Sequence, residues 1–124
     1  MNWKGKKVWI IGASSGIGQG LAIAFNQIGA FVILSSRNSD RLQQTQALLA
    51  APESSDIIPL DLSASTSIQN GIEVFQARHS SIDLLIHSGG ISQRAIAEET
   101  SIATTKQIFE SNFFGQIPIT LFAV

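Results

Sequence analysis

Three glycines between a short apolar run and a helical repeat constrain the fold of this chain more than any other feature. Residues 8–11 are apolar without alternation and lie between Lys7 and Gly12, which predicts a buried parallel strand. The spacing Gly12-x-x-x-Gly16-x-Gly18 follows directly. The next apolar residues recur at helical spacing, at Ile17, Leu21, Ala24, Phe25 and Ile28. A strand, a glycine turn and a helix in this order predict the start of a βαβ unit.

The same alternation of strand and helix continues along the chain. Further apolar runs predict strands at residues 30–34, 57–60 and 82–86. The candidate helix starts are Asn38 or Ser39, Ser63 or Ser65, and a position near Ser101. Pro52 is expected to close the first of these helices. Strand and helix repeated four times predict an α/β protein in which a parallel sheet lies between two layers of helices.

Composition excludes several classes of protein. The chain has 124 residues, 44% of them apolar and 14% charged, so it can bury a core and is not a disordered chain. A formal net charge of −1 argues against a nucleic-acid partner, and no apolar stretch approaches the ~20 residues of a membrane span. Without cysteine, and without acids at metal-ligand spacing from a histidine, no disulfide and no metal site are expected. These features favour a soluble, cytoplasmic protein.

The glycine turn has a specific chemical use. Its first glycine permits a tight turn, its second lets the backbone approach a pyrophosphate, and its third lets the helix pack closely on the strand. The helix N-terminus adds free N–H groups and a partial positive charge. A glycine turn without a ligand is the alternative, but the position between a strand and a helix favours phosphate binding. The candidate binding residues in this turn are Gly12, Ser14, Ser15, Gly16, Ile17 and Gly18.

Residues 12–18 also resemble the cofactor motif of the short-chain dehydrogenase/reductase family. Three later stretches fit that family in order: Asp61-Leu62, His87-Ser88-Gly89-Gly90 and Asn112-Phe113-Phe114-Gly115. They are similar to the family's adenine-contacting Asp, its Asn-Asn-Ala-Gly motif and its Asn-x-x-Gly. The resemblance implies a Rossmann-type, doubly wound sheet with strand order 3-2-1-4, as a single NAD(P)-binding domain over residues 1–124. It also implies that the C-terminal half of the family's fold is missing.

The resemblance implies further cofactor contacts from Asp61, Leu62, Ser88, Gly89 and Gly90. A helix cap is the competing use of Asp61. The chain departs from the family pattern where Ile11 replaces a Thr, and where His87 and Ser88 replace two asparagines. We interpret His87 as structural rather than as a base, and we expect His79 to be an exposed residue at a helix end.

The residues after the second strand bear on which nicotinamide cofactor would bind. NAD selectivity needs a carboxylate there for the ribose 2′-hydroxyl, whereas NADP selectivity needs a cation for the 2′-phosphate. The candidates are Ser36, Arg37 and Asn38, and none of them is an acid. The Arg37 guanidinium suits a phosphate, although a solvated surface charge is the alternative. We therefore expect NADP in preference to NAD.

Catalysis is the least complete part of the resemblance. The family uses a Tyr as proton donor, with a Lys, a Ser and an Asn, and only the Asn has a counterpart here, Asn112. The chain contains no tyrosine. We expect the NADP(H)-binding part of an enzyme that interconverts a small-molecule carbonyl and an alcohol, inactive as this chain, from a homodimeric or homotetrameric parent. The alternatives are a non-catalytic nucleotide-binding module and a degenerate truncated product.

Overall fold

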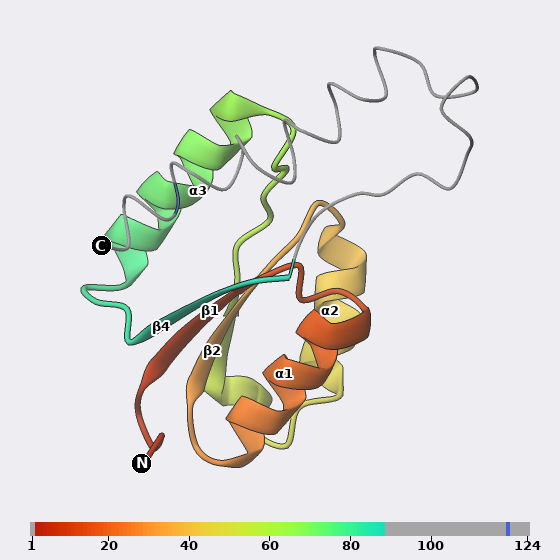
Figure 1. The fold of residues 1–124 in the computed structure, drawn as a ribbon, viewed down its shortest axis with the longest axis vertical. Coiled ribbons are helices and arrows are strands. Elements are labelled where there is room, and N and C mark those ends of the chain that lie inside the picture. Colours follow the sequence, from red (N-terminus) through yellow and green to blue (C-terminus); the bar gives the residue numbers. More distant parts are fainter. Residues whose placement is uncertain (1, 89–118, 120–124) are drawn as a thin grey trace.

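A parallel sheet organises the part of the chain that the structure, a computed structural model, describes: residues 2–88 and Ile119. Its strands are β1 (Lys7–Ile11), β2 (Phe31–Ser35), β3 (Ser55–Ile57) and β4 (Leu84–His87). They lie in the order β3-β2-β1-β4 and all pair in parallel (Figure 1). The predicted order 3-2-1-4 is confirmed.

Helices cover both faces of this sheet, which confirms the predicted three layers. The helices are α1 (Gly16–Gln27), α2 (Ser39–Ala47) and α3 (Ser65–Arg78), with a short 3-10 turn, η1 (Pro52–Ser54). Figure 1 shows α1 and α2 on one face and α3 on the other. Alternate residues of β1 point to opposite faces of the sheet. Val8 and Ile10 pack in the core under α1 and α2 (the α1/α2 core), and Trp9 and Ile11 pack in the core under α3 (the α3 core).

The α3 core contains a buried aromatic pair. The rings of Trp9 and Phe75 are stacked, with centroids 4.5 Å apart and an interplanar angle of 14°. The Trp9 indole N–H donates to the Ser35 hydroxyl oxygen at 2.8 Å, so the polar edge of the ring is paired inside the core.

The third strand begins earlier than the sequence predicts. In place of residues 57–60, the structure has β3 at Ser55–Ile57, where Ile57 pairs with Leu34 of β2. Beyond β3 the chain still follows β2, because the Leu60 N–H donates to the Ser36 carbonyl at 2.9 Å. Pro59 cannot donate to a sheet, which explains why regular pairing stops before it. The predicted bounds were therefore wrong, although the apolar run does lie alongside β2 and the residue that follows it.

Helix α1 forms where predicted, but only part of its apolar stripe packs on the core, through the partly buried Leu21 and Phe25. The buried residues are Gly18, Ala22 and Asn26, whereas Ile17 is 78% and Ile28 is 56% exposed. Asn26 tolerates burial because its amide is paired with the loop before η1. Its Nδ2 donates to the Ala51 carbonyl at 2.9 Å, and its Oδ1 accepts from the Ala51 N–H at 2.8 Å.

The helix starts agree only in part with the predicted caps. Asn38 caps α2, because its Oδ1 accepts from the Arg41 N–H at 3.1 Å. The end of α2 at Ala47 comes before Pro52, which instead begins η1. Neither Ser63 nor Ser65 caps α3, since its N-cap is Ala64 and no side chain bonds there. The helix expected near Ser101 lies outside the described residues.

Candidate functional site

The strands β1, β2 and β4 end at one edge of the sheet, where the glycine turn crosses between them. The N–H groups of Gly12 and Ala13 donate to the Ser35 carbonyl, at 2.7 and 3.1 Å. The Ser88 N–H donates to the Ile11 carbonyl at 2.8 Å. The glycine turn is thus anchored to the end of β2, and the residue after β4 is anchored to the end of β1. This carboxyl edge is where open α/β sheets bind ligands.

Two of the three glycines in the turn have backbone conformations that favour glycine, with φ of +95° at Gly12 and +57° at Gly16. Gly18 is required for a different reason. A Cβ there would overlap the Gly12 carbonyl oxygen and the Ser88 hydroxyl, closer than real Cβ atoms approach any atom. The absence of a side chain therefore allows the first turn of α1 to pack against both strand ends.

The N-terminus of α1 is open. Its N-cap, Ser15, has an extended backbone and makes no side-chain capping hydrogen bond. Ser15, Gly16 and Ile17 are exposed, and Ser14 is partly so. The first N–H groups of a helix need partners from outside the helix and carry a partial positive charge. An anion can supply those partners here, and among the described residues the space beside Gly16 is open.

The end of β2 presents hydroxyl and cationic groups. The Ser36 hydroxyl oxygen is buried and has no hydrogen-bond partner among the described residues. Arg37 is exposed, and no acid lies between Ser35 and Asn38. The Oδ1 of Asn38 is committed to the α2 cap, so only its NH₂ group remains to donate to a ligand. A serine hydroxyl, an amide NH₂ group and a guanidinium can all donate, so these groups can bind phosphate oxygens.

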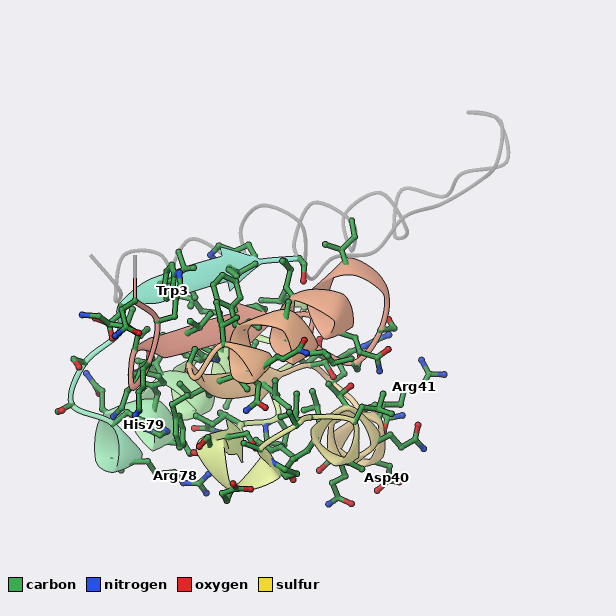
Figure 2. All side chains as sticks on the ribbon, turned by 90° about the horizontal axis from the view of Figure 1, so that it is seen from below. Trp3, Asp40, Arg41, Arg78 and His79 are labelled. Carbon is green, nitrogen blue, oxygen red and sulfur yellow. The ribbon has the colours of Figure 1, made fainter. Side chains whose placement is uncertain are left out.

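A second cation, Arg41, is a residue that the sequence analysis missed. It lies in the first turn of α2, exposed, four positions after Arg37. Figure 2 shows its side chain extending from α2 into solvent. The hydrogen bond from the Arg41 N–H to the Asn38 side chain places Arg41 at the carboxyl edge of the sheet. The predicted helix cap at Asn38 was the sequence signal that could have identified Arg41 as a neighbour of Arg37.

Asp61 does not cap α3, whose N-cap is Ala64, but it holds the turn before that helix. Its Oδ1 accepts from the Ser63 N–H at 2.9 Å and from the Ser63 hydroxyl at 2.7 Å, and its own N–H donates to the Ser67 hydroxyl. The carboxylate thus shapes the turn before α3 through one oxygen. Leu62 packs in the α3 core with 8% of its surface exposed, which commits its side chain to packing.

Ser88 closes the site from the side of β4. Its hydroxyl lies 3.0 Å from the Ile11 carbonyl oxygen and 3.3 Å from that of Gly12, and it donates to these acceptors. A serine therefore ties β4 to the glycine turn at the position where the family pattern has an asparagine. Burial lowers the pKa of the neighbouring His87, which favours the neutral imidazole.

Other expected site residues lie outside the part of the chain that the structure describes: Gly89, Gly90 and Asn112. Within residues 2–88 and Ile119, no group of three or more acids and histidines could hold a metal ion. No helix of that same part is both long and apolar enough to cross a membrane.

The opposite edge of the sheet holds a side-chain network that the sequence analysis did not anticipate. His79 was expected to be exposed, but its side chain is only 7% exposed and its ring packs near Phe31 and Phe75. Its Nδ1 lies 3.3 Å from the Lys7 Nζ, and its Nε2 lies 2.9 Å from Asp56 Oδ2. An ammonium only donates, so Nδ1 accepts and Nε2–H donates to the carboxylate.

Arg78 completes this network by bonding the other oxygen of Asp56 at 3.0 Å. In Figure 2, Arg78 and His79 lie at the end of the molecule away from Asp40 and Arg41. The network therefore stands far from the glycine turn. A helix-end histidine carries no periodic signal of its burial, which explains the wrong prediction.

Comparisons with known proteins agree with the geometry. The family model for short chain dehydrogenase matches residues 6–123. The "Dehydrogenase/reductase SDR family protein 7-like" of Anopheles gambiae is 38% identical over 122 residues, which cover 94% of this chain and 38% of the relative. The "11-beta-hydroxysteroid dehydrogenase-like 2" of Arabidopsis thaliana is 36% identical over 126 residues, which cover 99% of this chain and 41% of that protein.

Solved structures share the fold. A short chain dehydrogenase from Bacillus anthracis superposes with a TM-score of 0.87 at 25% identity, covering 98% of this chain and 49% of that one. A gluconate 5-dehydrogenase from Burkholderia cenocepacia, solved in complex with NADP and tartrate, gives a TM-score of 0.83 at 22% identity, covering 97% and 48%. The chain thus spans about two fifths of its curated relatives and about half of these structures.

Proposed function

The chain belongs to the short-chain dehydrogenase family, and from this premise we propose that it forms the NADP(H)-binding part of an oxidoreductase that interconverts a carbonyl and an alcohol. The observation that carries the proposal is the open N-terminus of α1 beside the glycine turn. A dinucleotide pyrophosphate fits this place because it needs close backbone approach and N–H donors.

The proposed preference for NADP rests on the end of β2. The Ser36 hydroxyl, which has no partner within residues 2–88 and Ile119, can donate to a phosphate oxygen, and the exposed Arg37 supplies the matching charge. Residues 35–38 include no carboxylate that could accept from a ribose 2′-hydroxyl. The gluconate 5-dehydrogenase of the same fold, whose structure contains NADP, is consistent with this choice.

In the proposed reaction, the bound nicotinamide cofactor supplies or accepts the hydride. The described residues of this chain bind and orient the cofactor. Helix α1 and the glycine turn bind the pyrophosphate, and Ser36 and Arg37 bind the 2′-phosphate. The adenosine side is bound by Asp61, Ser88 and the backbone of Leu62. Gly89 and Gly90 are proposed to extend that surface, and Asn112 to support proton transfer. The 124 residues contain no tyrosine, so we expect the isolated chain to bind cofactor without reducing a carbonyl.

The complete enzyme would act on a small-molecule carbonyl or alcohol, as a cytoplasmic homodimer or homotetramer.

The proposal is tested by calorimetric titration of the 124-residue chain with NADPH and with NADH. The wild-type chain should bind NADPH more tightly. Arg37→Asp should weaken NADPH binding by about tenfold or more and reverse the preference, because it replaces a phosphate-binding cation with an acceptor for the ribose hydroxyl. Lys6→Asp makes the same charge change at an exposed position at the opposite edge, so it should leave both affinities unchanged.

The results separate the parts of the proposal. An unchanged ratio of the two affinities in Arg37→Asp would show that Arg37 does not select the cofactor. Absence of binding by the folded wild-type chain would overturn the nucleotide-binding proposal itself. Turnover of NADPH with a panel of ketones would contradict the expected inactivity.

A further inference from the structure

A buried threonine joins the glycine turn to the two helices beside it. Thr45 lies in α2 and is fully buried, with none of its surface exposed. Its hydroxyl oxygen lies 3.0 Å from the Ala13 carbonyl oxygen and 3.0 Å from Gln19 Nε2. The Ala13 carbonyl can only accept and the Gln19 amide nitrogen can only donate, so the direction of both hydrogen bonds is fixed.

This arrangement orients one peptide group of the glycine turn. The Ala13 N–H is held by the Ser35 carbonyl of β2, and the Ala13 carbonyl is held by Thr45 of α2. The peptide between Ala13 and Ser14 is trans, so its N–H points opposite to its carbonyl. Thr45 therefore directs the Ser14 N–H away from α2, while Gln19 links the same hydroxyl to the first turns of α1.

A threonine at this position needs an explanation. Threonine is a poor helix former, and a buried hydroxyl is costly unless it is paired. The neighbouring buried residue of the same helix, Leu42, shows that this face of α2 otherwise serves apolar packing. The hydroxyl thus serves the glycine turn rather than the core.

We propose that Thr45 is a positioning residue for dinucleotide binding, which orients the Ser14 N–H toward the pyrophosphate. This inference rests on the proposed function and adds to it a residue of α2 that does not contact the cofactor. The affinity for the pyrophosphate then depends on the Thr45 hydroxyl of α2, which bonds the Ala13 carbonyl of the glycine turn.

The test compares two ligands on one variant. Thr45→Val keeps the shape of the side chain and removes the hydroxyl, and it should lower the affinity for NADPH about tenfold. Adenosine 2′-monophosphate lacks the pyrophosphate, so its affinity, measured by ligand-observed NMR titration, should change by less than about twofold. Thr45→Ser should restore NADPH binding, and Thr66→Val, the same change at an exposed position of α3, should have no effect.

The outcomes distinguish this inference from the proposed function. An equal loss for both ligands would show a merely structural role and overturn the inference, as would unchanged NADPH binding in Thr45→Val. If the wild-type chain binds neither ligand, the proposed function fails as well. Should Thr45→Val not fold, as judged by circular dichroism, Gln19→Ala is the second variant. A several-fold selective loss of NADPH affinity supports the network, and no loss contradicts it.

Discussion

The two edges of the sheet use their polar groups in opposite ways. At the amino edge, Lys7, His79, Asp56 and Arg78 bond to one another, and the histidine ring is almost entirely buried. At the carboxyl edge, the helix α1 has no side-chain cap and the Ser36 hydroxyl has no partner among residues 2–88 and Ile119. The same parallel sheet therefore ends in a closed network on one side and in unpaired groups on the other.

The difference indicates that the amino edge contributes to stability and the carboxyl edge to ligand binding. Polar groups that are paired within the protein contribute to the folded state, whereas groups left unpaired at a strand end are available to a ligand. Substitutions at the amino edge should therefore change the free energy of unfolding, and substitutions at the carboxyl edge should change cofactor affinity.

The largest effect is expected at Gly18, where a substitution should lower both the free energy of unfolding and the affinity for the cofactor. Gly18→Ala places a Cβ against the Gly12 carbonyl and the Ser88 hydroxyl, so a backbone shift is required. We expect a loss of about 3 kcal/mol in the free energy of unfolding by urea, and NADPH binding below detection.

Gly20→Ala is the matched control for this variant. Gly20 lies in the same helix with open space around it and no positive φ. The substitution should stabilise the chain by about 0.5–1 kcal/mol and leave binding intact. Equal unfolding free energies and equal NADPH affinities in the two variants would show that the close approach at Gly18 contributes to neither property.

A smaller and selective effect is expected at the amino edge. His79→Ala removes the ring packed near Phe31 and Phe75 and leaves Asp56 and Lys7 without their shared partner. We expect a loss of about 2 kcal/mol in unfolding free energy and an unchanged Kd for NADPH, measured under native conditions. Ser80→Ala, at the next and exposed position, is the control. A weakened Kd in His79→Ala would break the proposed separation of the two edges.

The smallest effect is a pH dependence from His87 at the end of β4. Burial lowers the pKa of His87, so the unfolded chain binds a proton more readily than the folded chain. This contribution to stability is therefore fully present above the unfolded pKa of about 6.5 and is lost as the pH falls through that value toward the lower folded pKa.

The measurement is the unfolding free energy between pH 8 and pH 5 for the wild type and for His87→Asn. The difference between the two curves isolates His87 from the other titrating groups. The wild type should lose more stability than the variant as the pH falls. Parallel curves would mean that burial of His87 has no effect on its protonation.

The sequence predicts what depends on local pattern, and misses what depends on distant partners. Apolar runs and glycine spacing were sufficient for the alternation of strands and helices and for the turn between Ile11 and α1, whereas the strand order came from the family resemblance. The burial of His79 was not predictable in the same way, because it depends on Lys7 and Asp56 from other strands. The burial of Asn26 in α1 was missed for the same reason, since its amide is paired with the Ala51 backbone.

The candidate site shows the same limit. Glycines at positions 12, 16 and 18 were identified from spacing alone, because backbone geometry demands that residue type. Thr45 had no motif to mark it, and its role depends on a carbonyl 32 positions earlier in the chain. The sequence left Asp61 open between a helix cap and an adenine contact. In the structure it does not cap α3 but bonds Ser63 in the turn before that helix.

The paired indole of Trp9 gives this molecule an internal optical probe. The chain contains two tryptophans and no tyrosine, so its ultraviolet fluorescence comes from Trp3 and Trp9. Trp9 is fully buried, and its N–H is bound to Ser35, the residue whose carbonyl anchors the glycine turn. In a Trp3→Phe variant, the emission would come from this one ring. Changes in its wavelength or intensity would then follow both unfolding and ligand binding without any added label.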